Sequence, residues 1–415
     1  MLSASFPPSR HPLSRHAAYL LAAATIGLAL FSSGTPSPLY GTYSQLWGFD
    51  SIVLTLVYAT YAFGVLLSLL LAGRLSDEVG RRPVLVVSMA ALVVATIPFM
   101  LADSVVWLFV ARAIQGLATG LALSAASAAL LDLHPKRDPV SVSLANGVAS
   151  TIGMGTGVII SAAIVQFLPA PRVLPYVLLL ILFLGFLVAS WRMKEPVEVA
   201  PGAHFHLTPQ RPSVPAVARR PFILASLAVI SSWSIAGLFL SLGPELSALV
   251  YKSDTHLISG IGIVMLALSA AVSQVLFGRW APYRAAALGS LALAAGMGLI
   301  VAAAAADSAV LFTVGAIVTG AGFGVAFLGG LRALSSAIPP EHRAATMSAF
   351  YLVAYGALSI PAVIAGFVVE PLGVRETFEI FGSVIIVIAL LVTAEAWRQR
   401  PRSTVRAGEL SAQPS

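Results

Sequence analysis

The chain has 415 residues, of which 58% are hydrophobic and only 10% are charged, and its formal net charge is +7. This balance excludes an ordinary soluble domain, because a soluble protein of this length needs a larger charged surface to stay dispersed. The absence of cysteine excludes a disulfide framework, a cysteine zinc site and a thiol nucleophile.

Long apolar segments recur along the whole chain. A helix needs about 20 apolar residues to cross about 30 Å of hydrocarbon. Arg10 and Arg15 precede the first segment as in a signal peptide, but no small-residue cleavage site follows, so we expect a retained helix. Asp50 is placed to cap the second helix. The predicted spans are 17–38, 52–73, 83–102, 105–131, 140–166, 173–193, 221–243, 257–280, 284–305, 308–333, 343–369 and 374–397.

The basic residues predict the orientation of these spans. With the N-terminus in the cytoplasm, 20 of the 24 Lys and Arg residues fall in cytoplasmic segments, and only Arg172, Lys252 and Arg375 fall outside. This asymmetry predicts a multi-pass protein of the cell's inner membrane with both termini in the cytoplasm. It also explains the basic charge by contacts with anionic membrane lipids, so no nucleic-acid partner is expected.

The spans divide into two groups of six. We expect an N-terminal bundle at 1–193, a cytoplasmic linker at 194–220, a C-terminal bundle at 221–397 and a cytoplasmic tail at 398–415. A shift of about 204 residues aligns corresponding loops of the two halves and places Gly116 and Gly120 on Gly320 and Gly324. The sequence therefore predicts an all-α membrane protein made of two pseudo-symmetric six-helix bundles.

The loop after the second predicted helix carries the most specific motif. Residues 73–82 read Gly-Arg-Leu-Ser-Asp-Glu-Val-Gly-Arg-Arg. This segment resembles the signature of the major facilitator superfamily between its second and third helices, except that Glu78 stands where the family has a basic residue. The resemblance implies that Asp77 meets the eleventh helix near Arg343 and that the motif controls opening of the cytoplasmic side. Its candidate gating residues are Gly73, Asp77, Gly80, Arg81 and Arg82.

A single arginine lies deep in the fourth predicted span. Arg112 should face the bundle interior, because an exposed charge in hydrocarbon is costly, and Gln115 and Gly116 share its helix face. The run Arg112–Gly116 resembles a second superfamily pattern, Arg-x-x-Gln-Gly, which implies a role in proton coupling beside the cavity. A purely structural role, in which Arg112 satisfies main-chain carbonyls, is the alternative. Gly153 and Gly157 resemble half of an antiporter motif and favour export.

In this superfamily helices 1, 4, 7 and 10 line the central path, and polar or aromatic side chains on or beside them are candidates for the cavity. Intramembrane acids are absent from the middle of the spans, so the candidate proton carriers lie near helix ends, at Glu245 and Asp132. The neutral, aromatic path suits apolar or amphiphilic substrates. The cavity candidates are Ser33, Tyr58, Tyr61, Trp233, Gln274, Tyr351 and Tyr355.

These features predict a secondary active transporter that exports small, largely apolar or amphiphilic molecules by proton antiport and alternating access. Its partners would be the small-molecule substrate, protons and lipids, with no cofactor, and it would act as a monomer. An importer of a small metabolite is the alternative within the same fold. An intramembrane enzyme is disfavoured because no span contains both a nucleophile and a base that could activate it. Direct use of ATP is disfavoured because the sequence lacks a phosphate-binding loop for ATP. A receptor on a transporter scaffold would carry a larger polar domain.

Overall fold

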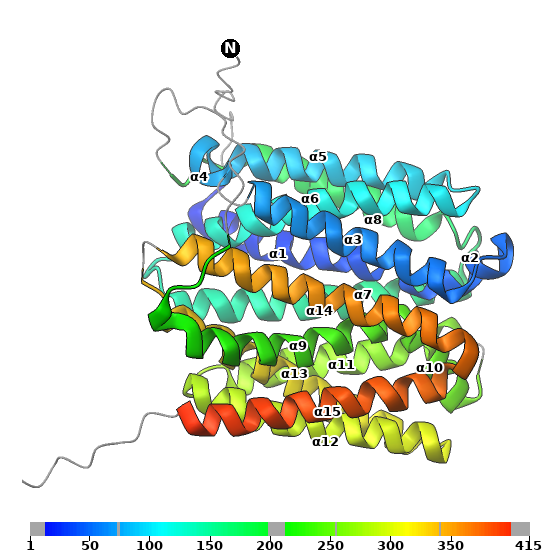
Figure 1. The fold of residues 1–415 in the computed structure, drawn as a ribbon. Coiled ribbons are helices and arrows are strands. Elements are labelled where there is room, and N and C mark those ends of the chain that lie inside the picture. Colours follow the sequence, from blue (N-terminus) through cyan, green and yellow to red (C-terminus); the bar gives the residue numbers. More distant parts are fainter. Residues whose placement is uncertain (1–12, 73–74, 198–211, 254, 340–341, 400–415) are drawn as a thin grey trace, which may run out of the picture.

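The computed structural model describes residues 13–72, 75–197, 212–253, 255–339 and 342–399, which form a bundle of long helices (Figure 1). Its first half contains α1 (Arg15–Gly34), η1 (Ser37–Leu39), α2 (Tyr40–Trp47), α3 (Ser51–Ala72), α4 (Leu75–Val79), α5 (Arg81–Met100), α6 (Val105–Leu133), α7 (Pro139–Phe167) and α8 (Leu174–Arg192). Its second half contains η2 (Ala216–Ala218), α9 (Arg219–Ser241), α10 (Gly243–Tyr251), α11 (His256–Phe277), α12 (Pro282–Ala306), α13 (Ala309–Ala337), α14 (Arg343–Leu372) and α15 (Val374–Gln399).

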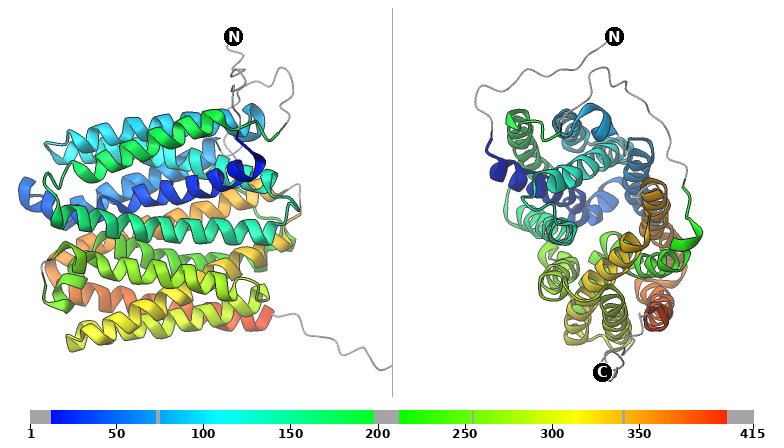
Figure 2. Two further views of the ribbon diagram at one scale, coloured as in Figure 1. Left: turned by 180° about the vertical axis from the view of Figure 1, so that it is seen from behind. Right: turned by 90° about the vertical axis from the view of Figure 1, so that its left-hand side faces the viewer.

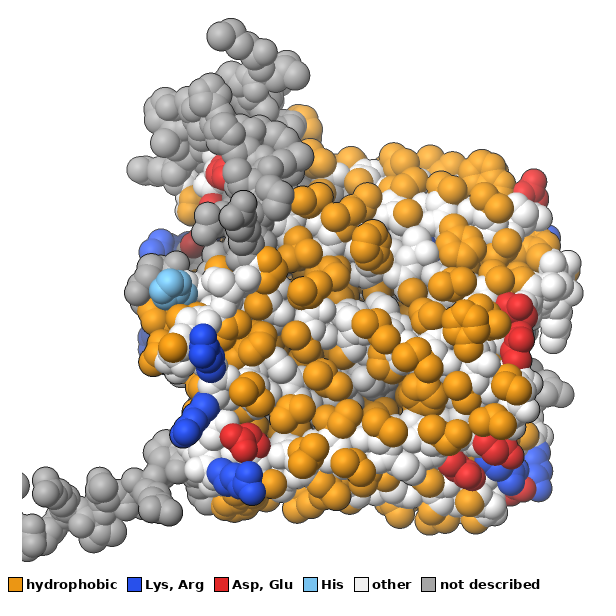
Figure 3. All heavy atoms as spheres, viewed as in Figure 1, with side chains coloured by type: hydrophobic (Ala, Val, Ile, Leu, Met, Phe, Trp, Pro, Cys, Tyr) orange, Lys and Arg blue, Asp and Glu red, His pale blue; other side chains and the backbone are white. Residues whose placement is uncertain are grey.

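Within the described residues, 12 segments are long and apolar enough to cross a membrane. Large apolar side chains point outward from their flanks; Phe63, Phe167 and Val310 are 64%, 69% and 72% exposed. Figure 3 shows apolar side chains spread over the visible lateral face, with charged groups at the two ends. Such a surface is stable only in contact with lipid, which confirms the prediction of a multi-pass membrane protein.

The helices form two groups that lie side by side (Figure 2). In the first group α6 packs against α3 and α5, and in the second α12 packs against α13 and α15. The two groups meet along two pairs of helices, α7 with α11 and α3 with α14. The predicted pair of six-helix bundles is therefore confirmed.

The repeated glycines have equivalent packing roles in the two halves. A Cβ atom on Gly116 or Gly120 of α6 would lie 2.3 Å from Tyr61 O or 2.6 Å from a side-chain atom of α3. A Cβ atom on Gly320 or Gly324 of α13 would lie 2.2 Å or 2.6 Å from main-chain oxygens of α11. Since α3 and α11 are the second spans of their halves, and α6 and α13 the fourth, the same helix pair makes the same close contact twice.

Short polar residues begin several of the helices. Asp50 accepts a hydrogen bond from Val53 N over 2.8 Å, which confirms it as the cap of α3. Asp138 accepts from Val140 N and Ser141 N at the start of α7, and Ser308 accepts from Leu311 N at the start of α13. The pKa of the Asp138 carboxyl is lowered by the hydrogen bonds it accepts, and the bond from the Ser141 hydroxyl has the largest effect.

The first span differs from the prediction. It does not end at residue 38; the chain continues through η1 and α2 to Trp47. Pro36 and Pro38 cause the interruption, because a proline has no N–H to donate to the carbonyl four residues earlier. The carbonyls freed at the end of α1 need other donors, and these donors come from α6 and α7.

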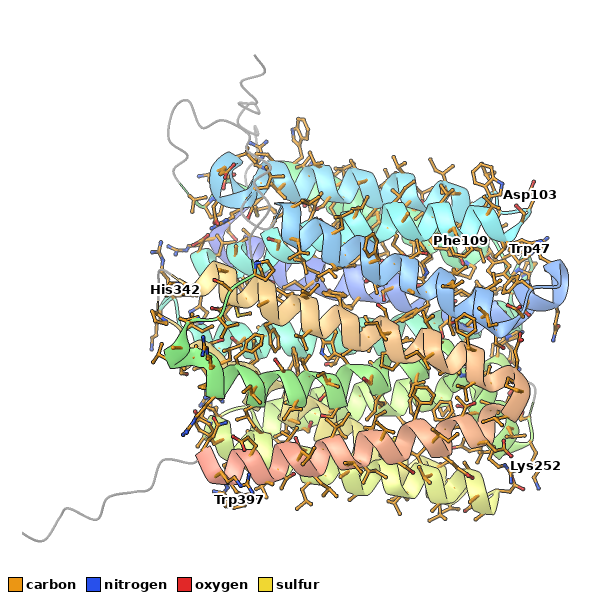
Figure 4. All side chains as sticks on the ribbon, viewed as in Figure 1. Trp47, Asp103, Phe109, Lys252, His342 and Trp397 are labelled. Carbon is orange, nitrogen blue, oxygen red and sulfur yellow. The ribbon has the colours of Figure 1, made fainter. Side chains whose placement is uncertain are left out.

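We name the two ends of the bundle by the residues they carry. The terminal end holds the start of α1 and the end of α15, and the distal end holds the turns after α2, α5 and α10. Figure 4 shows His342 and Trp397 at the terminal end and Trp47, Asp103 and Lys252 at the distal end. All long helices run between these ends (Figure 1).

Candidate functional site

Arg112 lies inside the N-terminal half with no solvent exposure. Its Nε donates to the Tyr40 hydroxyl over 3.0 Å and its Nη1 donates to the main-chain oxygen of Ser33 over 3.2 Å. The same Nη1 donates to Gln115 Oε1 over 2.7 Å. These partners are neutral, and none of the ion pairs found among the described residues includes Arg112.

Aromatic rings complete the surroundings of this guanidinium. Its Cζ lies 5.7 Å from the ring centre of Tyr40, 5.2 Å from that of Tyr61 and 5.8 Å from that of Phe99. Attraction between a cation and aromatic rings is strongest where water is excluded. The rings therefore replace part of the stabilisation that a carboxylate would give, and they connect α6 to α2, α3 and α5.

Arg112 and Gln115 both serve the broken end of α1. Gln115 Nε2 donates to Ser32 O over 2.9 Å, while Arg112 binds Ser33 O. On α7, Ser161 Oγ donates to Thr35 O over 2.6 Å. A broken membrane helix is stable only where neighbouring side chains satisfy its freed main-chain groups. The same α7 helix packs closely on α1, since a Cβ atom on Gly153 or Gly157 would lie 2.0 Å or 2.2 Å from an α1 carbonyl.

Five of the candidate cavity residues come together between the two halves. Tyr58 and Tyr61 of α3 and Tyr355 of α14 are buried in one cluster, against which Trp233 of α9 and Tyr351 of α14 pack. We call these five residues the aromatic cluster. The Trp233 ring meets Tyr355 edge-on, with ring centres 5.1 Å apart. Both halves contribute to this cluster, so a change in their relative position must rearrange it.

Phe327 of α13 extends the aromatic cluster, because its ring centre lies 5.7 Å from that of Trp233. Ser33 lies at the end of α1, where its main-chain oxygen accepts from Arg112 and its side chain meets that of Tyr61 in the aromatic cluster. Gln274 lies at the contact between α11 and α7, where a Cβ atom on Gly147 would be 2.7 Å from its Oε1. This Oε1 is buried and has no hydrogen-bond partner among the described residues.

The two candidate proton carriers lie at opposite ends of the bundle. Glu245 is in the first turn of α10 at the distal end, and its side chain is exposed. Neighbouring protein atoms nevertheless reduce its hydration enough to raise the pKa of its carboxyl. Asp132 is at the terminal end of α6, where its Oδ2 accepts from Arg81 Nε over 2.9 Å. Neither residue belongs to the aromatic cluster.

The motif residues Asp77, Gly80, Arg81 and Arg82 gather at the terminal end. The buried Arg81 joins three helices, because it also donates to Ser76 Oγ on α4 over 2.9 Å and pairs with Asp77. The side chain of Asp77 is 59% exposed. The sequence resemblance predicts that Asp77 meets the eleventh helix near Arg343. This helix, α14, begins at Arg343, whose side chain lies outside the described part of the structure. Gly73 is also outside the described residues.

Glu195, which the sequence analysis missed, caps the helix that follows the motif. Its Oε1 accepts from Arg81 N over 2.8 Å and its Oε2 accepts from Arg82 N over 3.0 Å, so a carboxylate after α8 closes the start of α5. Burial raises the pKa of Glu195 in spite of these hydrogen bonds. Glu195 lies more than 100 residues from the helix that it caps, so the sequence around α5 contains no capping motif that would predict this contact.

Gly80 makes room for this carboxylate. Its φ of +100° is a conformation that L side chains rarely adopt, and an added Cβ atom would lie 2.6 Å from Glu195 Oε2. The neighbouring Arg82 donates from Nε and Nη2 to Trp191 O over 3.1 Å and 2.8 Å. The motif thus fastens α4, α5, α6 and the end of α8 into one unit at the terminal end.

The comparisons with known proteins agree with this architecture. The family profile of the Major Facilitator Superfamily matches residues 22–360. The human organic anion transporter MFSD10 (TETRAN) has the same fold, with a TM-score of 0.66 over 92% of this chain and 100% of that chain, at 15% sequence identity.

Similarity to curated sequences covers smaller parts. The multidrug resistance protein MdtL of Klebsiella pneumoniae is 32% identical over 126 residues, which is 30% of this chain and 32% of that protein. An uncharacterized transporter of Schizosaccharomyces pombe is 29% identical over 130 residues, 31% of this chain and 27% of its own length. The chain thus spans about a third of the length of these relatives. With the family profile matching most of its length, the chain belongs to the major facilitator superfamily of membrane transporters.

Proposed function

We propose that this protein is a secondary active exporter of small, largely apolar or amphiphilic molecules, driven by proton antiport. In this proposal it works as a monomer in the inner membrane, with the terminal end in the cytoplasm. The partial similarity to a multidrug resistance protein supports export. The asymmetric distribution of Lys and Arg supports the orientation.

The aromatic cluster is the observation that carries the proposal. Tyr58, Tyr61, Tyr351, Tyr355 and Trp233 offer flat apolar faces and a few hydroxyl groups, and they come from both halves. Aromatic side chains bind flat or cationic apolar molecules through burial, stacking and cation–π attraction. A substrate held here would contact both halves at once, as alternating access around a central site requires.

The contacts between the halves are of a kind that can separate. At the distal end they include two hydrogen bonds among the described residues, from Ser37 Oγ to Leu240 O over 3.0 Å and from Leu257 N to Gln166 Oε1 over 3.3 Å. Elsewhere small residues pack against each other, as where Gly155 of α7 faces Ala267 of α11. Within the N-terminal half, by contrast, Arg112 and Arg81 each join several helices. We infer that each half moves as a unit while the contacts between them break and re-form.

For the proton, we propose Glu245 as the carrier at the distal end. Its raised pKa favours proton uptake from the outer side, where an antiporter receives its driving proton. Asp132 is the second candidate carrier, at the terminal end, where its carboxylate pairs with Arg81 of the gating motif. In this scheme Arg112 couples the two carriers through the broken end of α1.

The test uses purified protein in liposomes, a fluorescent cationic dye and an imposed pH gradient. We expect the dye to accumulate in the acidic lumen and to leave when the gradient is dissipated. Trp233→Ala should raise the dye concentration for half-maximal transport by about tenfold, since a lost aromatic contact costs on the order of 1 kcal/mol or more. Trp233→Phe should keep most of the affinity.

The matched control is Trp107→Ala, because Trp107 is 39% exposed on the lateral surface of α6. It removes the same side chain outside the aromatic cluster and should transport as the wild type does. No dye movement across an intact gradient would argue against drug export and favour the import of a small metabolite. Equal loss in both tryptophan variants would reject the aromatic cluster as the binding site.

A further inference from the structure

A basic surface lies at the terminal end of the C-terminal half, where α9 begins and α15 ends. Arg219 and Arg220 occupy the first turn of α9 and are exposed, and the side chain of Arg398 near the end of α15 is 80% exposed. Gln399 joins the two helix ends, because its Nε2 donates to Arg220 O over 3.1 Å. Figure 3 shows Lys and Arg side chains gathered over this corner.

The charges at this corner are not balanced within it. Glu395 is the acid beside them; it lies 3.9 Å from Arg398 and accepts from Gln399 over 2.8 Å. The first turn of α9 contains no acidic residue and its start has no side-chain cap. Two arginines in the first turn of a helix are opposed by the positive end of the helix dipole. An anion from outside the protein would relieve this repulsion.

Apolar side chains continue from the basic corner along both helices. Ile223 of α9 is 52% exposed and lies one turn beyond Arg219 and Arg220 on the same face. On α15, Leu391 is 54% exposed and lies two turns before Arg398 on the same face. Val387 and Val384 extend this apolar face, with 57% and 53% exposure.

An aromatic residue marks the boundary between the charged and apolar parts. Trp397 is 47% exposed beside Arg398, at the terminal end of α15 (Figure 4). Tryptophan favours the interface between lipid headgroups and hydrocarbon. The surface therefore presents positive charge, an interfacial ring and an aliphatic strip in the order in which a phospholipid presents its phosphate, glycerol and acyl chains.

We propose that Arg219, Arg220 and Arg398 form a binding site for one anionic phospholipid of the leaflet at the terminal end. The phosphate lies between the first turn of α9 and the last turn of α15, and the acyl chains lie along Ile223 and Leu391. A soluble phosphate would not use the apolar strip, and an acidic protein would not either. The bound lipid bridges the first and last spans of the C-terminal half.

Native mass spectrometry of the purified full-length protein tests the site. Phosphatidylglycerol and phosphatidylcholine with identical acyl chains are titrated separately, and glycerol phosphate is the soluble competitor. We expect one phosphatidylglycerol to be retained with about tenfold higher affinity than phosphatidylcholine. The triple variant Arg219→Gln, Arg220→Gln, Arg398→Gln should lose this preference.

The matched control removes three exposed cations elsewhere at the same end of the bundle, in Lys136→Gln, Arg137→Gln, Arg279→Gln. It should keep the preference, and equal loss in both triple variants would overturn the proposal in favour of a general charge effect. Displacement of the lipid by glycerol phosphate alone would also overturn it. If the triple variant does not yield monodisperse protein, Arg398→Gln alone serves, because its exposed side chain supports no core; an unchanged lipid preference there would count against the site.

Discussion

Gln115 donates a hydrogen bond to the main-chain oxygen of Ser32, 2.9 Å away. In a continuous helix the donor to this oxygen would be the N–H of residue 36, but residue 36 is a proline. Thr35 and Pro36 keep right-handed helical backbone angles, so the chain around the missing donor is still helical. A side chain of α6 thus replaces a main-chain donor of α1, and the two helices depend on each other at this point.

Replacement of Gln115 by leucine should therefore destabilise the protein by about 1–3 kcal/mol, because a buried carbonyl loses its donor. Thermal denaturation in detergent measures the effect. Pro36→Ala restores an N–H at residue 36 and should recover much of the loss in the double variant, while changing the stability little on its own. A double variant no more stable than Gln115→Leu would show that Ser32 O is not the partner that matters.

Arg112→Lys should reduce dye transport by at least about tenfold although the positive charge remains. A lysine has one compact donor group, whereas the arginine fork binds Tyr40, Ser33 O and Gln115 together. The variant should still insert and be recovered as a monodisperse protein. Arg172→Lys, at an exposed distal position, is the control and should transport normally. Full transport by Arg112→Lys would show that transport needs only a positive charge at residue 112 and not the hydrogen bonds of the guanidinium.

The spans could be predicted from the sequence because hydrocarbon imposes a simple length requirement that each apolar segment meets. The grouping of Arg112 with Gln115 followed from helical spacing alone. The extension of the first span to Trp47 was missed, although Pro36 and Pro38 were visible. Their effect was hard to judge, because a broken membrane helix survives only where another helix supplies donors.

The tertiary partners could not be predicted in the same way. Asp132 was considered only as a proton carrier, and its pairing with Arg81 depends on how α6 meets the turn before α5. Glu195 capping α5 depends on the end of α8 reaching the same point. Likewise, aromatic residues on α3, α9 and α14 form one cluster only because two halves of the chain meet along those helices.

The pH dependence of stability should reveal the buried state of Glu195. Because burial raises its pKa above the ordinary value of 4.5, the folded protein holds this proton more tightly than the unfolded chain. The stabilisation is full below the ordinary value and is lost as the pH rises through the raised pKa. The melting temperature of the wild type relative to Glu195→Gln should therefore fall as the pH rises. A relative melting temperature that rises with pH would mean that the ionised carboxylate is the favoured cap.

Alanine substitutions at two glycines with positive φ distinguish the cost of backbone strain from the cost of a steric clash with Glu195. Gly80 and Gly48 have φ of +100° and +66°, but only at Gly80 would a Cβ atom meet another group, Glu195 Oε2 at 2.6 Å; around Gly48 there is open space. Gly48→Ala should cost about 1 kcal/mol through backbone strain alone. Gly80→Ala should cost more, about 2–4 kcal/mol, because it adds displacement of the cap to a rarer backbone conformation.

The double variant Gly80→Ala, Glu195→Ala distinguishes these two contributions. If the carboxylate contact dominates, the two changes should cost clearly less together than the sum of the single variants, since the cap is already absent when the methyl group is added. If strain at residue 80 dominates, the costs should add. Additive costs, measured by thermal denaturation of all three variants, would leave Gly80 as a turn residue and remove its link to the end of α8.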